Sequence, residues 1–212
     1  MHIELNTNAL RMAMDAAWKA VEAVRKADAA RKSLELERQR YGLSVENLRY
    51  RDKLDSINNA EKKTVCSMKT AFKSHSDAVR DSVAKAAFPS GENIKDESVK
   101  NDIWILTEKY IKYAEELEEL RRKYSSPVNP VMLRVIERYA AENFPEKAAG
   151  FAFETDVRRC LSLWAALVQL ANEAFEDAYG PAAAALEGFM DPVTESANVE
   201  AFTRWAENQK EN

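Results

Sequence analysis

Glycine and proline are scarce in this sequence, which limits the number of turns that the chain can make. The 212 residues include 5 glycines and 6 prolines, and Gly42 is the single member of either type before Pro89. A β-sheet protein of this length needs many more turns, so the scarcity favours long helices joined by few loops. Ala, Glu, Lys, Arg and Leu are abundant, and these residues have high helix propensity. The sequence therefore predicts an all-α fold.

Two long amphipathic helices are expected in the first part of the chain. The first begins near Asn8, ends at Gly42 and carries an apolar stripe at spacings of four and three residues: Leu10, Met14, Ala17, Val21 and Val24. The second begins at Ser44, a residue that can cap a helix, and extends to Phe88. The sequence leaves open whether this helix bends at Asn58-Asn59. A continuous helix would span roughly 65 Å, which is longer than the core of a compact domain requires.

A third helix is expected at Val99–Tyr124, after a turn-rich linker and with Ser98 as its cap. Its apolar residues follow a heptad pattern: Val99, Ile103, Leu106, Tyr110, Tyr113, Leu117, Leu120 and Tyr124. We expect this seam to pack on the first two helices, which would form an elongated, antiparallel, coiled-coil-like three-helix region. Because the first two helices are longer than the third, self-association or a partner protein is an alternative use of the seam.

A compact helical subdomain is expected at residues 129–212. Asn129-Pro130 combines a cap residue with a proline at the first helical position, and a further helix begins at Thr155 with an apolar middle. A short helix follows Gly180-Pro181, and the last one carries Phe202. The expected domains are therefore residues 1–90, 91–128 and 129–212.

Charge is distributed unevenly over these three segments, although the net charge of the chain is only −4. Residues 1–90 contain 17 Lys and Arg against 12 Asp and Glu, so this segment is basic. Residues 91–128 contain 7 against 9, and residues 129–212 contain 7 against 14. A basic hairpin and an acidic C-terminal subdomain indicate different surroundings for the two ends.

The residues that most enzymes need are rare in this chain. No P-loop, GxGxxG, GxSxG or HExxH pattern occurs. His2 lies at the terminus, and His75 falls on the expected inner stripe of the second helix, where a core or interface role is favoured over that of a ligand or base. Cys66 and Cys160 have no metal-ligand spacing, and Cys160 is expected to be a packing residue. We therefore expect no catalytic residue, no metal site, no cofactor and no small-molecule substrate.

The second helix carries a line of regularly spaced basic residues, which is the clearest candidate for a binding site in this sequence. Its members recur at spacings of 7, 4 and 7 residues, with one more upstream: Lys62, Lys69, Lys73 and Arg80, preceded by Arg51. The first four span about 27 Å of one helix face. They could contact a phosphate backbone or an acidic protein, or they could be an ordinary solvated surface. On the third helix, an acidic stripe is expected to face outward: Glu108, Glu115 and Glu119.

These patterns favour a binding role over a chemical one. We expect a non-enzymatic protein–protein interaction module, acting as an adaptor, an inhibitor or an assembly component through the exposed faces of long helices. A helical subunit that binds a nucleic-acid backbone in a nucleoprotein complex is the alternative, followed by a structural component of a viral particle or filament. The sequence shows no signal peptide and no membrane-spanning stretch, so a cytoplasmic protein without a membrane partner is expected.

Overall fold

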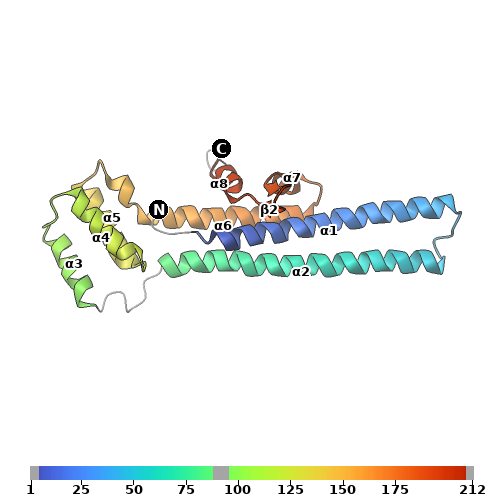
Figure 1. The fold of residues 1–212 in the computed structure, drawn as a ribbon, viewed down its shortest axis with the longest axis horizontal. Helices are drawn as coiled ribbons and strands as arrows, with labels where there is room; N and C mark the ends of the chain where they lie inside the picture. Colours follow the sequence, from blue (N-terminus) through green and yellow to red (C-terminus); the bar gives the residue numbers. More distant parts are fainter. Residues whose placement is uncertain (1–4, 88–95, 209–212) are drawn as a thin grey trace. The chain divides into compact units, whose positions relative to one another are not determined.

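The computed structural model describes residues 5–87 and 96–208, and most of them are helical (Figure 1). The described residues form eight α-helices: α1 (Thr7–Arg40), α2 (Leu48–Ala87), α3 (Glu97–Thr107), α4 (Ala114–Ser125), α5 (Pro130–Asn143), α6 (Phe153–Glu176), α7 (Pro181–Gly188) and α8 (Val199–Asn208). A 3-10 helix, η2 (Ala148–Phe151), and an antiparallel pair of two-residue strands, β1 (Met190–Asp191) and β2 (Ser196–Ala197), complete the order. The predicted all-α fold is confirmed.

The chain contains two compact units. The first, called the hairpin unit, comprises residues 7–78 and the described part of 163–212. The second, called the α3–α5 unit, comprises the described parts of 1–6 and 79–162. The division into residues 1–90, 91–128 and 129–212 stays a prediction.

The hairpin unit is built on α1 and α2, which lie side by side in antiparallel directions (Figure 1). Gly42, in the left-handed backbone region at φ 61°, follows the end of α1 as expected. The second helix begins later than Ser44, because the Asn47 side chain accepts the N–H of Tyr50 at 3.3 Å and takes the capping role. From Leu48 it continues through Asn58-Asn59 without a break.

On α1, the residues that are completely buried in the core of the hairpin unit lie in the first half of the helix. Its fully buried side chains there include Leu10, Ala13, Met14 and Ala17. On α2, no residue between Leu48 and Ala71 is fully buried, whereas Phe72 is and meets Phe175 of α6 edge-to-face at 5.5 Å. The helix that accompanies α2 here is therefore α6. The part of the hairpin nearer the α1–α2 turn has only a thin apolar seam.

The prediction of one continuous helix at Val99–Tyr124 is wrong. The helix α3 ends at Thr107 and α4 begins at Ala114, with Lys109 at φ 56° between them. The carboxylate of Glu116 accepts the N–H groups of Lys112 and Tyr113 at 3.0 and 3.3 Å, which satisfies donors at the start of α4. The prediction that Ser98 caps this helix is also wrong. The N-cap of α3 is Asp96, whose side chain accepts the N–H of Ser98.

Burial along the heptad seam explains the break. Leu106 and Leu117 are buried on either side of it, whereas Tyr110 and Tyr113 are 58% and 67% exposed. The two halves are instead joined through Asp102, whose carboxylate accepts from the Lys123 ammonium at 2.6 Å and from a tyrosine hydroxyl of α4. Both halves also contact α5. Because α3 and α4 each pack on α5, the two ends of the seam are buried. The middle of the seam lies between the two helices and stays exposed.

This break can be tested by replacing Lys109 with glycine. A non-glycine residue in the left-handed region costs about 1–2 kcal/mol, so Lys109→Gly is expected to raise the free energy of unfolding by about 0.5–1 kcal/mol. Lys100→Gly, inside α3, is the matched control and is expected to lower it by about 1 kcal/mol. Urea denaturation measures both. Equal destabilisation by both variants would mean that residue 109 is helical and that α3 and α4 are one helix.

The expected starts of the C-terminal helices are largely confirmed. The Asn129 side chain accepts the N–H of Met132 at 3.1 Å, and Pro130 is the first residue of α5. The next helix, α6, begins at Phe153, two residues before the expected Thr155. The short helix α7 starts at Pro181, and α8 carries Phe202. The strand pair between them was not expected.

Candidate interaction surfaces of the helical hairpin

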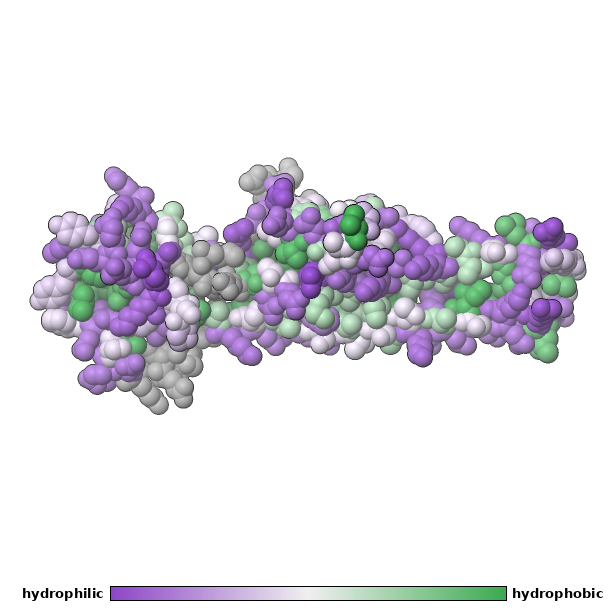
Figure 2. Space-filling model, viewed as in Figure 1, coloured by the Kyte–Doolittle hydropathy of each residue, from purple (hydrophilic) through white to green (hydrophobic). Residues whose placement is uncertain are grey.

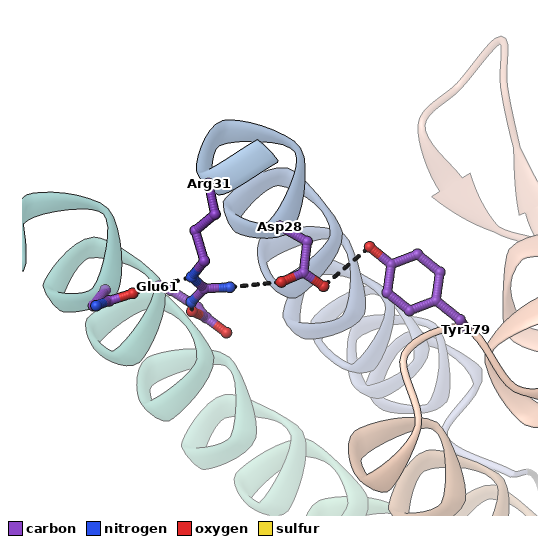
Figure 3. A network of polar contacts seen from close by, with 5 residues as sticks. Asp28, Arg31, Glu61 and Tyr179 are labelled. Carbon is purple, nitrogen blue, oxygen red and sulfur yellow. Dashed lines mark hydrogen bonds and ion pairs between the residues drawn. The ribbon is translucent and has the colours of Figure 1, made fainter. Parts of the chain in front are cut away.

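A network of polar contacts holds α1 and α2 together midway along the hairpin (Figure 3). The Arg31 guanidinium donates to Asp28 at 2.6 Å, to the Asn58 amide oxygen at 3.0 Å and to the carboxylate of Glu61. The hydroxyl of Tyr179, after α6, donates to Asp28 at 3.1 Å. Arg31 and Asp28 of α1 together thus link α2 to the chain that follows α6.

A second network fixes the end of the hairpin. The Glu35 carboxylate accepts from Arg38 at 2.6 Å, from Gln39 at 3.0 Å and from the Tyr50 hydroxyl at 3.2 Å. The hydrogen bond from Arg38, together with those from Gln39 and Tyr50, lowers the pKa of Glu35 to about 2. The three donors therefore favour the ionised form of this carboxylate.

Three residues of the predicted basic line gather on α2 in the hairpin unit. Lys62, Lys69 and Lys73 are all exposed, and within the described residues no ion pair engages any of them. They border a shallow hollow of about 790 Å³, here called the basic groove, which is lined by Glu61, Lys62, Val65, Cys66, Lys69, Thr70 and Lys73. The Lys69 ammonium also lies 4.9 Å from the ring centroid of Phe175 on α6. The groove therefore combines cationic side chains with a narrow apolar strip.

The other two residues of the predicted line do not line the basic groove. Arg51 is exposed on α2, nearer its start. Arg80 belongs to the α3–α5 unit, where its guanidinium pairs with Asp81 at 3.2 Å. The signal that sequence reasoning missed is the pair Val65 and Cys66, which supplies the apolar strip between the lysines.

The two cysteines and the inner histidine have different surroundings. Cys66 is exposed in the basic groove, whereas Cys160 on α6 is buried. Burial raises the pKa of the Cys160 thiol, as expected of a packing residue. His75 is half-buried beside the buried Ser76 rather than fully enclosed in the core. A thiol reagent will therefore distinguish the groove cysteine from the other.

A second hollow lies between α1 and α2 and has little charge on its floor. Its volume is about 590 Å³, and small or apolar residues of both helices line most of it, among them Ala23, Ala27, Ala30, Ile57 and Met68. Its rim carries charges of both signs, among them Lys26 and Glu22, which form an ion pair at 2.8 Å. This hollow offers apolar surface but no charge selectivity.

The predicted acidic stripe is only partly assembled, because its helix is broken. Glu108, Glu115 and Glu119 are all exposed, but Glu108 lies between α3 and α4 and the other two lie on α4. Glu115 is paired with the Lys147 ammonium at 2.8 Å, and this hydrogen bond lowers the pKa of Glu115. The three carboxylates therefore do not form one line on one helix.

Comparisons with models of protein families, with curated proteins and with solved structures find no match. In the described residues, no three His, Cys, Asp or Glu side chains are grouped so that they could hold a metal ion. None of the described helices is long and apolar enough to cross a membrane.

Proposed function

We propose that this protein is a non-enzymatic interaction module whose basic groove binds an acidic amphipathic helix of another protein. The observation that carries the proposal is the composition of the groove: three exposed lysines border Val65 and Cys66 on one stretch of α2. An apolar strip between cations is complementary to a helix with apolar residues on one side and carboxylates beside them.

The spacing of the lysines supports a helical partner. Lys62, Lys69 and Lys73 lie 7 and 4 residues apart, which corresponds to about 10 and 6 Å along the axis of α2. A partner helix packed alongside α2 has the same rise per residue. Carboxylates at the same two intervals would then face the three ammonium groups in register, as charged residues do beside the seam of a coiled coil.

Binding of a nucleic-acid backbone is the second candidate, and the same three exposed lysines favour it. Two features make it weaker. The chain as a whole carries a net charge of −4, which opposes the approach of a long polyanion. No aromatic side chain lines the basic groove, so bases would have no ring there on which to stack.

Charge reversal in the basic groove tests whether an acidic amphipathic helix binds there. The probe is a fluorescent synthetic peptide of about 18 residues, designed as an amphipathic helix with leucines on one face and glutamates beside them. We expect Lys62→Glu with Lys73→Glu to weaken its binding at least tenfold, because two attractive pairs become repulsive. Lys32→Glu with Lys63→Glu changes the charge equally at exposed lysines outside the groove and is expected to change binding less than threefold.

Cys66 reports where the peptide binds. A bound helix is expected to slow the reaction of the Cys66 thiol with Ellman's reagent, while the buried Cys160 contributes no fast phase. A peptide with glutamine in place of glutamate should give no protection. Binding that leaves Cys66 unprotected, or that survives the groove double variant, would refute the proposal. Tighter binding of a 20-nucleotide single strand than of the peptide would favour the nucleic-acid alternative.

A further inference from the structure

A hollow lies at the end of the hairpin, where α1, the turn and α2 meet. Its volume is about 620 Å³, which is within the range of about 300–1,000 Å³ of sites that bind small molecules. It is here called the tip hollow, and it is lined by Leu34, Glu37, Arg38, Tyr41, Leu43, Asn47, Arg49, Tyr50 and Lys53. Figure 2 shows apolar and strongly hydrophilic surface side by side at this end of the hairpin.

The apolar part of the lining consists of two leucine side chains and two tyrosine rings. Leu34 is 6% exposed, Leu43 and Tyr50 are half-buried, and Tyr41 is 65% exposed. Aromatic rings pair with other rings in offset-stacked or edge-to-face arrangements, and each pair contributes about 0.5–1.5 kcal/mol beyond the burial of area. The tip hollow is therefore suited to a ligand that carries a flat ring.

The charged part of the lining is mainly basic. Arg38, Arg49 and Lys53 line the tip hollow together with one carboxylate, that of Glu37. A second carboxylate, that of Glu35, pairs with Arg38 at 2.6 Å but does not line the hollow. With both carboxylates counted, the three cations exceed the anions by one charge. In the part of the chain that the structure describes, Arg49 is exposed and takes part in no ion pair.

The Arg49 guanidinium is close enough to Glu37 to affect its ionisation. The Lys53 ammonium donates to the Glu37 carboxylate at 2.9 Å, and this hydrogen bond and the charge of Lys53 lower the pKa of Glu37. The charge of Arg49 lowers this pKa further. Arg49 is thus held near the hollow, and a guanidinium can donate two parallel hydrogen bonds to one further anionic group.

Polar contacts between α1, the turn and α2 hold the lining in place. The Arg38 guanidinium donates to Glu35 at 2.6 Å and to the carbonyl of Leu43, in the turn, at 3.2 Å. The Tyr50 hydroxyl of α2 donates to Glu35 at 3.2 Å. The ion pair described in the preceding paragraph joins α2 to α1 a second time. A site whose walls are already in place loses little conformational entropy when a ligand binds.

We propose that the tip hollow binds a small organic anion that consists of an aromatic ring with a single carboxylate or sulfonate group. The ring packs on Tyr41 and Tyr50, and the anionic group accepts hydrogen bonds from Arg49. Because the surplus is one positive charge, a singly charged ligand fits better than a polyphosphate. The tip hollow and the basic groove share no residue, so this inference does not depend on the proposed function.

The first test uses two fluorescent probes that differ in charge. The anionic probe is 8-anilinonaphthalene-1-sulfonate, and the neutral probe is N-phenyl-1-naphthylamine, which has the same rings without the sulfonate. We expect Arg49→Gln to weaken binding of the anionic probe at least fivefold and to leave binding of the neutral probe within twofold. Arg51→Gln removes the same charge at an exposed arginine outside the tip hollow and should leave both probes within twofold.

The second test concerns the ring. Tyr41→Ala is expected to weaken binding of both probes at least threefold, because both lose an aromatic contact. Leu36→Ala is the matched control, since Leu36 is 66% exposed and does not line the tip hollow. This variant should leave binding of both probes within 1.5-fold of the wild type.

Amide proton–nitrogen spectra of the full chain locate the anionic probe. The largest shift changes are expected at Leu43, Asn47 and Tyr50. Changes centred on residues 62–73 would place the probe in the basic groove and overturn the proposal. So would the absence of saturable binding up to about 1 mM, binding that Arg49→Gln and Tyr41→Ala leave unchanged, or equal weakening of both probes by Arg49→Gln.

Discussion

Phe202→Ala is expected to lower the free energy of unfolding by about 3–5 kcal/mol. The Phe202 ring is completely buried and meets the ring of Phe189 edge-to-face at a centroid distance of 5.8 Å, with Trp205 at 5.9 Å on its own helix. Truncation removes the largest fully buried side chain of α8 and leaves a cavity in the core. It also removes both aromatic contacts, each worth about 0.5–1.5 kcal/mol.

Urea denaturation followed by circular dichroism measures this effect. Val193→Ala is a suitable control in the same unit, because Val193 is 88% exposed and the expected change is below about 0.5 kcal/mol. Phe202→Leu keeps most of the volume and is expected to cost clearly less than Phe202→Ala. A loss below 1 kcal/mol for the alanine variant would mean that Phe202 of α8 is not packed against Phe189 and Trp205.

The second large effect is expected within the heptad seam, where the structure predicts unequal costs for residues of one pattern. Leu117 is completely buried on α4, so Leu117→Ala is expected to cost about 2–5 kcal/mol. Tyr113 belongs to the same seam but is 67% exposed at the start of α4. Tyr113→Ala is therefore expected to lower the free energy of unfolding by less than about 1 kcal/mol, although it removes more atoms than Leu117→Ala does.

The contrast between these two variants tests the broken helix directly. A continuous helix at Val99–Tyr124 with its seam packed on other helices would bury Tyr113 as well as Leu117, and both alanine variants would then be strongly destabilised. Measurement of the two under the same denaturation conditions decides the matter. A Tyr113→Ala cost as large as that of Leu117→Ala would contradict the separation of α3 from α4.

The basic groove illustrates how far spacing alone can locate a candidate site. Periods of 7 and 4 residues identified Lys62, Lys69 and Lys73 as one face of α2, because helical geometry places such residues in line. The same rule also included Arg80, which belongs to another compact unit and has a partner of its own. Periodicity describes a helix, but it contains no information on where along that helix the neighbouring elements end.

Helix ends were readable from the chain itself when they depended on a few adjacent residues. Gly42, Asn129-Pro130 and Gly180-Pro181 mark ends or starts of helices, because capping and the left-handed region act over one turn. The extent of α2 through Asn58-Asn59 and the break at Lys109 depended on distant partners instead. Burial of a side chain requires surface from another part of the chain, so the local pattern specified helices while long-range packing specified which of their faces remain exposed.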